Sequence, residues 1–212
     1  MSSASSGQAI DGPYPDQSAN VIYQLLFCDR PDLFKEHHRG NLQEPWSILF
    51  DPNADAAALT KIAEDEQQES RVRTLAFNAL RLAGQAVPPQ QYLGTIIEVS
   101  LPEGLDTMAV FADGGARYIN HSGKVIVVEG KPNAFDDEIS AVIEASKPIV
   151  AAIGPWDKER LPPPAGGNIR LTFLVSDGLY FGEGPMDAMQ QQPIAAPLIA
   201  AATGLLIKLV DQ

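Results

Sequence analysis

The feature that most limits how this chain can fold is a series of short apolar segments separated by tight-turn sequences. Four such segments lie at residues 94–101, 105–112, 116–120 and 124–129. The last three are joined by Asp113-Gly114-Gly115 and by Asn120-His121-Ser122-Gly123, which suit turns with positive φ angles. Connections this short join neighbouring antiparallel strands. Residues 94–129 are therefore predicted to form a four-stranded antiparallel meander.

Helical segments flank the predicted strands. Apolar residues at helical spacing predict helices at 19–35, 54–82 (as a pair), 133–153 and 197–209, with interruptions at Pro31 and Pro148. A further hairpin is predicted from 168–175 and 179–181. Strands and helices are grouped and do not alternate strictly, which favours an α+β fold. We expect an antiparallel sheet, the four-strand meander plus the hairpin, covered by helices on one face.

The chain is predicted to divide into three parts. Residues 1–18, rich in Ser, Gly, Pro and Asp, are expected to be a disordered tail, residues 19–88 a helical subdomain and residues 89–212 the α+β domain. Within the helical part, the string from Ser70 to Leu80 resembles the second helix of a HEAT repeat. A single copy does not define a repeat protein. The helical hairpin is either a separate subdomain or a layer packed on the same sheet.

The charge of the chain excludes several classes of partner. Lysine and arginine number 15 and aspartate and glutamate 27, which gives a net charge of −12. The sequence therefore offers no basic surface for nucleic acid or for an anionic membrane. The most apolar stretch, residues 194–207, is shorter than the roughly 20 residues that a membrane span requires. With one cysteine and no secretory signal, the sequence predicts a soluble cytoplasmic protein.

The densest group of reactive side chains lies on the third predicted strand and the turn that follows it. Arg117 alternates with Tyr118 and Asn120, so Arg117 is expected on one face of the sheet and the other two on the opposite face. One interpretation is a binding site in which Arg117 holds an anion and His121 carries a proton, with Tyr118 or Tyr180 nearby. The other is turn chemistry, because an Asn-x-x-Gly string forms a tight turn without any further role.

No metal and no cofactor are predicted. His37 and His38 are adjacent, and neighbouring side chains on a helix point about 100° apart, which disfavours a shared ion. Cys28 lies at the end of an apolar helix and is expected to be a buried structural thiol. The string from Phe181 to Pro185 lacks the glycine pattern of a nucleotide-binding loop.

Two distinctive strings are ADGGARYINHSGK at residues 112–124 and GLYFGEGP at residues 178–185. They resemble a family of uncharacterised bacterial proteins of about this size, over the C-terminal part of the chain. The resemblance implies a bacterial, cytoplasmic protein. It carries no assigned activity, so no catalytic residue follows from it.

The sequence leads to one hypothesis of function and two alternatives. Because no catalytic pattern is recognisable, we expect a non-enzymatic protein-binding or adaptor module, whose acidity suits a basic partner, as in an immunity-type protein that binds a toxin. The first alternative is an enzyme that acts on a small anionic metabolite through Arg117 and His121. The second is a structural subunit that forms a homo-oligomer through the C-terminal helix, residues 197–210.

Overall fold

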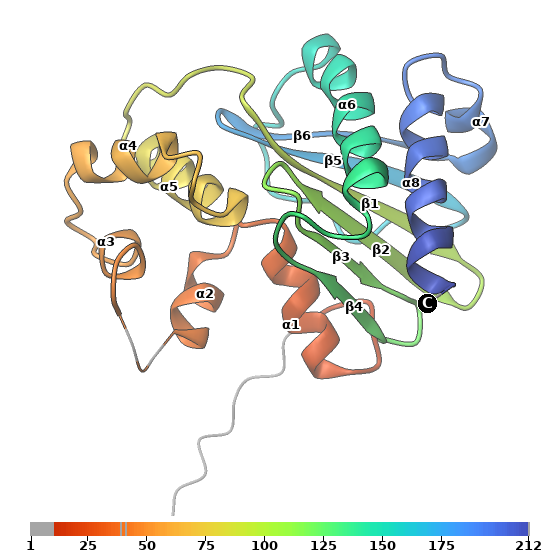
Figure 1. The fold of residues 1–212 in the computed structure, drawn as a ribbon, viewed down its shortest axis with the longest axis horizontal. Coiled ribbons are helices and arrows are strands. Elements are labelled where there is room, and N and C mark those ends of the chain that lie inside the picture. Colours follow the sequence, from red (N-terminus) through yellow and green to blue (C-terminus); the bar gives the residue numbers. More distant parts are fainter. Residues whose placement is uncertain (1–10, 39, 41, 212) are drawn as a thin grey trace, which may run out of the picture.

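The computed structural model describes residues 11–38, 40 and 42–211, which form a six-stranded antiparallel sheet and helices around it (Figure 1). The strands lie in the order β4-β3-β2-β1-β5-β6. Their bounds are β1 Tyr92–Leu101, β2 Gly104–Phe111, β3 Ala116–Ile119, β4 Val125–Val128, β5 Asn168–Val175 and β6 Gly178–Pro185. Every neighbouring pair is antiparallel, which confirms the predicted meander, the hairpin and the α+β class.

The helices begin and end mostly where the sequence predicts. They are α1 Gln17–Leu26, α2 Pro31–His37, α3 Trp46–Leu49, α4 Ala56–Glu64, α5 Ser70–Leu82, α6 Asp136–Ala152, α7 Met186–Gln190 and α8 Ala196–Val210. Pro31 begins α2, which confirms the interruption of the first helix. Pro148 is expected to kink or split its helix, and the split is wrong, since α6 continues through it. Pro148 and Glu144 are both exposed, so water can bind the Glu144 carbonyl that loses its helical partner.

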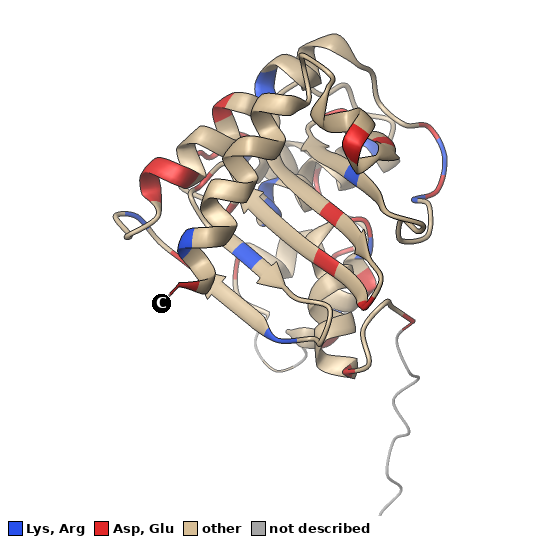
Figure 2. Ribbon diagram, turned by 90° about the vertical axis from the view of Figure 1, so that its right-hand side faces the viewer, with Lys and Arg blue, Asp and Glu red and all other residues tan. Residues whose placement is uncertain are grey.

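Helices α6 and α8 pack on one face of the sheet. Helix α6 starts with Asp136, Asp137 and Glu138, whose negative charges favour a helix N-terminus (red in Figure 2). Lys208, near the end of α8, binds Glu138 at 2.7 Å, so the two helices run antiparallel. The buried residues of these helices, among them Val142 and Leu205, form one core with the side chains that the strands direct to this face. Those strand residues include Ile97, Met108, Val110 and Phe173.

The opposite face of the sheet is covered as well. Helices α1 and α5 contribute to its core, and α4 packs on α5. This second core includes Tyr23, Phe27, Phe77, Ile96 and Phe111. The expectation of helices on one face only is therefore wrong. The reason is that the strands are apolar on both faces: Ile96 and Ile97 are successive residues, point to opposite sides and are 0% and 4% exposed.

The fold begins before the predicted end of the N-terminal tail. Tyr14 is buried, and its hydroxyl donates a hydrogen bond to Thr107 Oγ1 at 2.7 Å. The Asp16 carboxylate accepts from the Ala19 N–H and caps α1. Residues 11–18 thus belong to the folded part, and the rest of the predicted tail lies outside the described residues. None of the described helices is long and apolar enough to cross a bilayer.

Substitutions on the two faces of β1 test this two-sided packing. We expect Ile96→Ala and Ile97→Ala each to lower the free energy of unfolding by about 2–5 kcal/mol, because both leave a cavity in a core. Leu82→Ala is the control, since Leu82 is 85% exposed and its truncation should change stability by less than about 1 kcal/mol. Urea unfolding measures all three. A neutral result at either isoleucine would contradict a sheet buried on both faces.

Candidate functional site

The β3–β4 hairpin directs the predicted site residues to opposite faces of the sheet. Arg117 lies on the face of α1 and α5, and Tyr118 lies on the face of α6 and α8, as alternation along the strand predicts. Tyr180 is on β6, at the far edge of the sheet, and its hydroxyl donates to the Asp177 carboxylate at 3.0 Å. The structure therefore does not bring Arg117, His121 and Tyr180 together.

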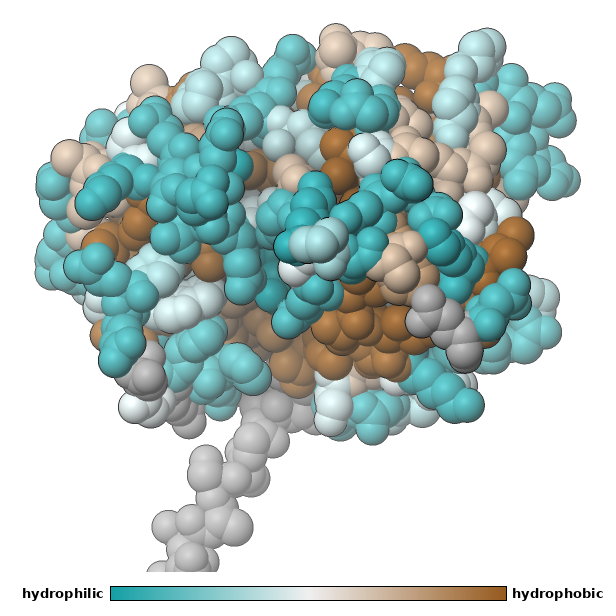
Figure 3. Space-filling model, viewed as in Figure 1, coloured by the Kyte–Doolittle hydropathy of each residue, from teal (hydrophilic) through white to brown (hydrophobic). Residues whose placement is uncertain are grey.

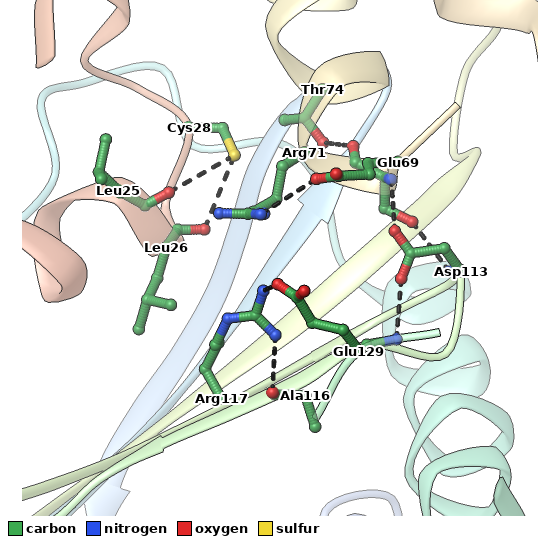
Figure 4. A network of polar contacts seen from close by, with 12 residues as sticks. Leu25, Leu26, Cys28, Glu69, Arg71, Thr74, Asp113, Ala116, Arg117 and Glu129 are labelled. Carbon is green, nitrogen blue, oxygen red and sulfur yellow. Dashed lines mark hydrogen bonds and ion pairs between the residues drawn. The ribbon is translucent and has the colours of Figure 1, made fainter. Parts of the chain in front are cut away.

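Arg117 is held by groups of its own strand, β3, and of the end of the neighbouring strand β4 (Figure 4). Its Nη1 donates to the carbonyls of Ala116 and Val128, each at 2.9 Å, and its Nη2 binds Glu129 at 2.5 Å. Burial lowers the pKa of Arg117, and the nearby carboxylate of Glu129 offsets part of that effect. Arg117 thus lies at the wall of an open cleft with its guanidinium already paired.

This cleft is lined mainly by polar and charged residues and has a volume of about 590 Å³. We call it the acidic cleft, and its lining residues are Glu66, Gln67, Gln68, Glu69, Arg71, Phe111, Asp113, Gly115, Arg117, Glu129 and Gly130. Arg71 binds Glu69 at 3.0 Å and lies over the ring of Phe111, with 5.7 Å between the guanidinium carbon and the ring centre. The lining contains four carboxylates and two guanidinium groups, so its net charge is negative.

A reciprocal pair of hydrogen bonds fixes the floor of the acidic cleft. The Ser70 N–H donates to Asp113 Oδ2 at 2.7 Å, and the Asp113 N–H donates to Ser70 Oγ at 3.0 Å. The other Asp113 oxygen accepts from the Gly115 N–H. Ser70 is the first residue of α5, and Asp113, from the β2–β3 turn, accepts a hydrogen bond from its N–H. This contact joins the helical layer to the sheet.

His121 and Tyr118 meet at a carboxylate on the other face of the sheet. The Tyr118 hydroxyl donates to Asp106 Oδ2 at 2.6 Å, and the His121 N–H donates to Asp106 Oδ1 at 2.7 Å. The His121 ring nitrogen Nδ1 lies 3.3 Å from the same oxygen. Asp106 is a residue that our sequence reasoning missed. The signal in the sequence is that Asp106 lies at every second position with Met108 and Val110, which places an acidic side chain on an otherwise apolar face of the strand.

The surroundings of Asp106 are apolar. Asp106 and Tyr118 border a cavity of about 70 Å³, whose other walls include Met108, Ile169 and Leu206. Asn120 has a different role, because its side-chain oxygen accepts from the N–H groups of Ser122 and Lys124 and shapes the turn. The contacts of Asn120 thus fit the turn chemistry that the sequence offers as one interpretation.

A row of polar side chains crosses the sheet beneath α1. In register, Thr107 of β2 faces Glu98 of β1, which faces Arg170 of β5, which faces Glu183 of β6. Arg170 lies 2.7 Å from Glu183 and 3.7 Å from Glu98. The Tyr23 hydroxyl donates to Glu98 at 2.6 Å. The side chain of Glu98 is fully buried, and burial raises its pKa despite these contacts.

A larger, open cleft of about 1040 Å³ lies beside this row, between α1, the end of α5 and residues 156–163. Its charged walls are internally paired: Arg160 binds Asp29 at 2.7 Å, and Arg81 donates to the Ser176 carbonyl. Arg160 also lies over the Phe27 ring, 3.8 Å from its centre. The contacts of Arg160 fasten residues 156–163 to the segment that directly follows α1. The four acidic and four basic side chains of the lining leave the cleft without a dominant charge.

The other reactive residues singled out in the sequence have structural surroundings. Cys28 is fully buried, as predicted, and burial raises the pKa of its thiol to about 12. His38 stacks on Trp46, with 3.9 Å between ring centres. Within the described residues, no group of three or more His, Cys, Asp or Glu side chains is arranged to hold a metal ion.

The pH dependence of stability tests the burial of Glu98. Because the pKa of Glu98 is higher in the folded than in the unfolded chain, the folded state binds the proton of the Glu98 carboxyl group more tightly than the unfolded chain does. Relative to Glu98→Gln, the wild type should therefore lose stability as pH rises above about 4, by at most about 1.4 kcal/mol per pH unit. Urea unfolding between pH 4 and 7 measures the difference, with exposed Glu103→Gln as the control. A difference that stays constant with pH would refute the prediction.

Comparison of the chain with protein-family models, with curated proteins and with solved structures finds no match. The family resemblance expected from residues 112–124 and 178–185 stays a prediction.

Proposed function

We propose that this chain is a non-enzymatic protein-binding module that receives a basic segment of its partner in the acidic cleft. The observation that supports this proposal is the charge of the cleft lining. Both guanidinium groups, Arg71 and Arg117, already have a carboxylate partner within the cleft. Two further carboxylates, Glu66 and Asp113, belong to the same lining, so the negative charge exceeds the positive charge.

The exposure of the cleft carboxylates favours binding of a cation. The side chains of Glu69 and Glu129 are 61% and 69% exposed, so each keeps accessible oxygen lone pairs beside its intramolecular arginine. An exposed ion pair contributes at most about 1 kcal/mol, so recognition requires several charges in one segment. The net charge of −12 adds a long-range attraction that raises the association rate of a basic partner. The exposed carboxylates and the net negative charge suit a partner such as a basic toxin.

The enzyme alternative has less support. It requires Arg117 and His121 in one pocket, whereas the guanidinium faces the acidic cleft and the imidazole contacts Asp106 at 3.3 Å on the other face. His121 does have a carboxylate partner, and that pair is the part of the alternative that the geometry favours. We further propose, on the single buried thiol, that the protein acts in a reducing cytoplasm and, on the resemblance of residues 112–124 and 178–185, that it is bacterial.

Titration with short peptides tests the proposed site. We expect an octa-arginine peptide to change the NMR shifts of residues 66–71, 111–117 and 129–130, and an octa-glutamate peptide to change none. Glu66→Lys should weaken arginine-peptide binding about fivefold to tenfold, because it replaces an attraction with a repulsion of about 1 kcal/mol. Added salt should weaken binding further, since it screens exposed charges.

Glu103→Lys is the matched control, because it makes the same change of charge at the exposed β1–β2 turn, outside the cleft. Its affinity for the peptide should stay close to that of the wild type. Equal weakening by both variants would show that only the net charge attracts the peptide. Shift changes concentrated outside the acidic cleft would reject the site.

A further inference from the structure

We propose that strand β4 is the interface of a homodimer, in which two copies pair their β4 strands antiparallel across a two-fold axis. The six-stranded sheet would then continue from one copy into the other. The inference does not require a partner in the acidic cleft, although Glu129 borders both surfaces. It rests on the open edge of β4, on its apolar side chains and on the charges at its two ends.

The two edges of the sheet differ in protection. At the β6 edge, the Trp156 N–H donates to the Leu179 carbonyl at 2.7 Å, and the Trp156 ring packs against Phe181 with 4.8 Å between centres. At the β4 edge, no segment among the described residues forms a backbone hydrogen bond to the outer side of the strand. Proteins usually block such an edge with a proline, a bulge or a charged side chain within the strand. The sequence of β4 is Val-Ile-Val-Val and contains none of these, so only the shortness of this four-residue strand protects the edge.

The register of β4 identifies the backbone groups at this open edge. The Asn120 N–H donates to the Lys124 carbonyl at 3.0 Å, and Tyr118 pairs with Ile126 two residues further along. Lys124 and Ile126 therefore direct their backbone groups towards β3. The N–H and C=O groups of the intervening residues, Val125 and Val127, point outward and are available to another strand.

Apolar side chains surround these free groups. The side chain of Val127 is 53% exposed, and Val125 is partly buried against the second core. Figure 3 shows apolar side chains gathered on the surface where α1 and β4 lie in Figure 1. An apolar patch of this kind marks an interaction surface.

The charges at the strand ends favour a second copy as the occupant. Lys124 precedes β4 and Glu129 follows it. Antiparallel pairing brings Lys124 of one copy near the end that carries Glu129 of the partner subunit, with the two side chains on opposite faces of the sheet, whereas parallel pairing would place like charges together. A register centred on Ile126 places each Val125 opposite Val127 of the partner subunit, and each such pair exchanges both of its backbone hydrogen bonds. Cross-strand valine pairs add favourable contacts.

The net charge of the chain supplies a second signature of this dimer. Two copies of charge −12 repel one another, while the proposed interface is apolar. Added salt screens the repulsion and should therefore tighten the dimer. Binding of a basic partner in the acidic cleft has the opposite salt dependence, so the two proposals can fail separately.

Sedimentation velocity of the full chain over a range of concentrations tests the dimer. We expect reversible dimerisation that strengthens between 50 and 500 mM NaCl, as estimated from the screening lengths of about 14 Å and about 4 Å at those concentrations. Val127→Lys should weaken dimerisation at least about tenfold, because it introduces a charge at the centre of an apolar interface. Val127→Pro should weaken it similarly, since proline removes an outward N–H that the β3–β4 ladder does not use.

Ile207→Lys is the matched control and tests the interface expected from the sequence. Ile207 lies on α8 and is 55% exposed, close to the 53% of Val127. Its substitution should leave the dimer unchanged, and circular dichroism and thermal melting should verify that all three variants are folded. A wild type that stays monomeric at millimolar concentration would overturn the proposal. So would folded Val127 variants that dimerise as the wild type does, or a dimer disrupted only by Ile207→Lys.

Discussion

Burial of strand β1 on both faces is the constraint on which the rest of the structure depends. Its apolar residues point alternately to the two cores, so helices must cover both sides of the sheet. The same burial places Glu98 away from water, where an isolated charge is costly. Arg170 and Tyr23 offset that cost through direct contacts. A shift of β5 by two residues would place Thr172 or Asn168 opposite Glu98, so we infer that the polar row helps to fix the register.

The acidic cleft follows from the way in which the helical layer is attached. Ser70 and Asp113 exchange hydrogen bonds, which hold the start of α5 against the β2–β3 turn. The cleft walls therefore belong to regular elements and tight turns, and the carboxylates of Glu69, Asp113 and Glu129 are held by contacts before any partner arrives. Preorganisation of this kind lowers the entropic cost of binding. Glu129 comes directly after β4, so the cleft also borders the proposed dimer interface.

Local patterns in the sequence predict most of the fold and little of the candidate sites. The hairpins follow from turn residues between apolar segments, and α2 follows from Pro31, because both signals act within a few residues. The sequence left open whether the helical hairpin packs on the sheet, and the structure shows that it does, on the second face. The sequence could not decide this, since the assignment of helices to faces depends on long-range packing. The site residues likewise divide into those placed by local sequence and those placed by long-range pairing. Alternation places Arg117 and Tyr118 on opposite faces, whereas the meeting of His121 with Asp106 depends on how β2 pairs with β3.

The surroundings of Cys28 have a practical consequence for work in solution. The thiol is fully enclosed and its pKa is raised to about 12, so little thiolate forms at neutral pH. Labelling requires attack of the thiolate on the double bond of a maleimide, and it also requires access of the reagent to the sulfur. A single cysteine introduced at an exposed position would therefore react selectively in the native protein. Fluorescent or spin labels can thus be attached one at a time without replacement of the natural cysteine.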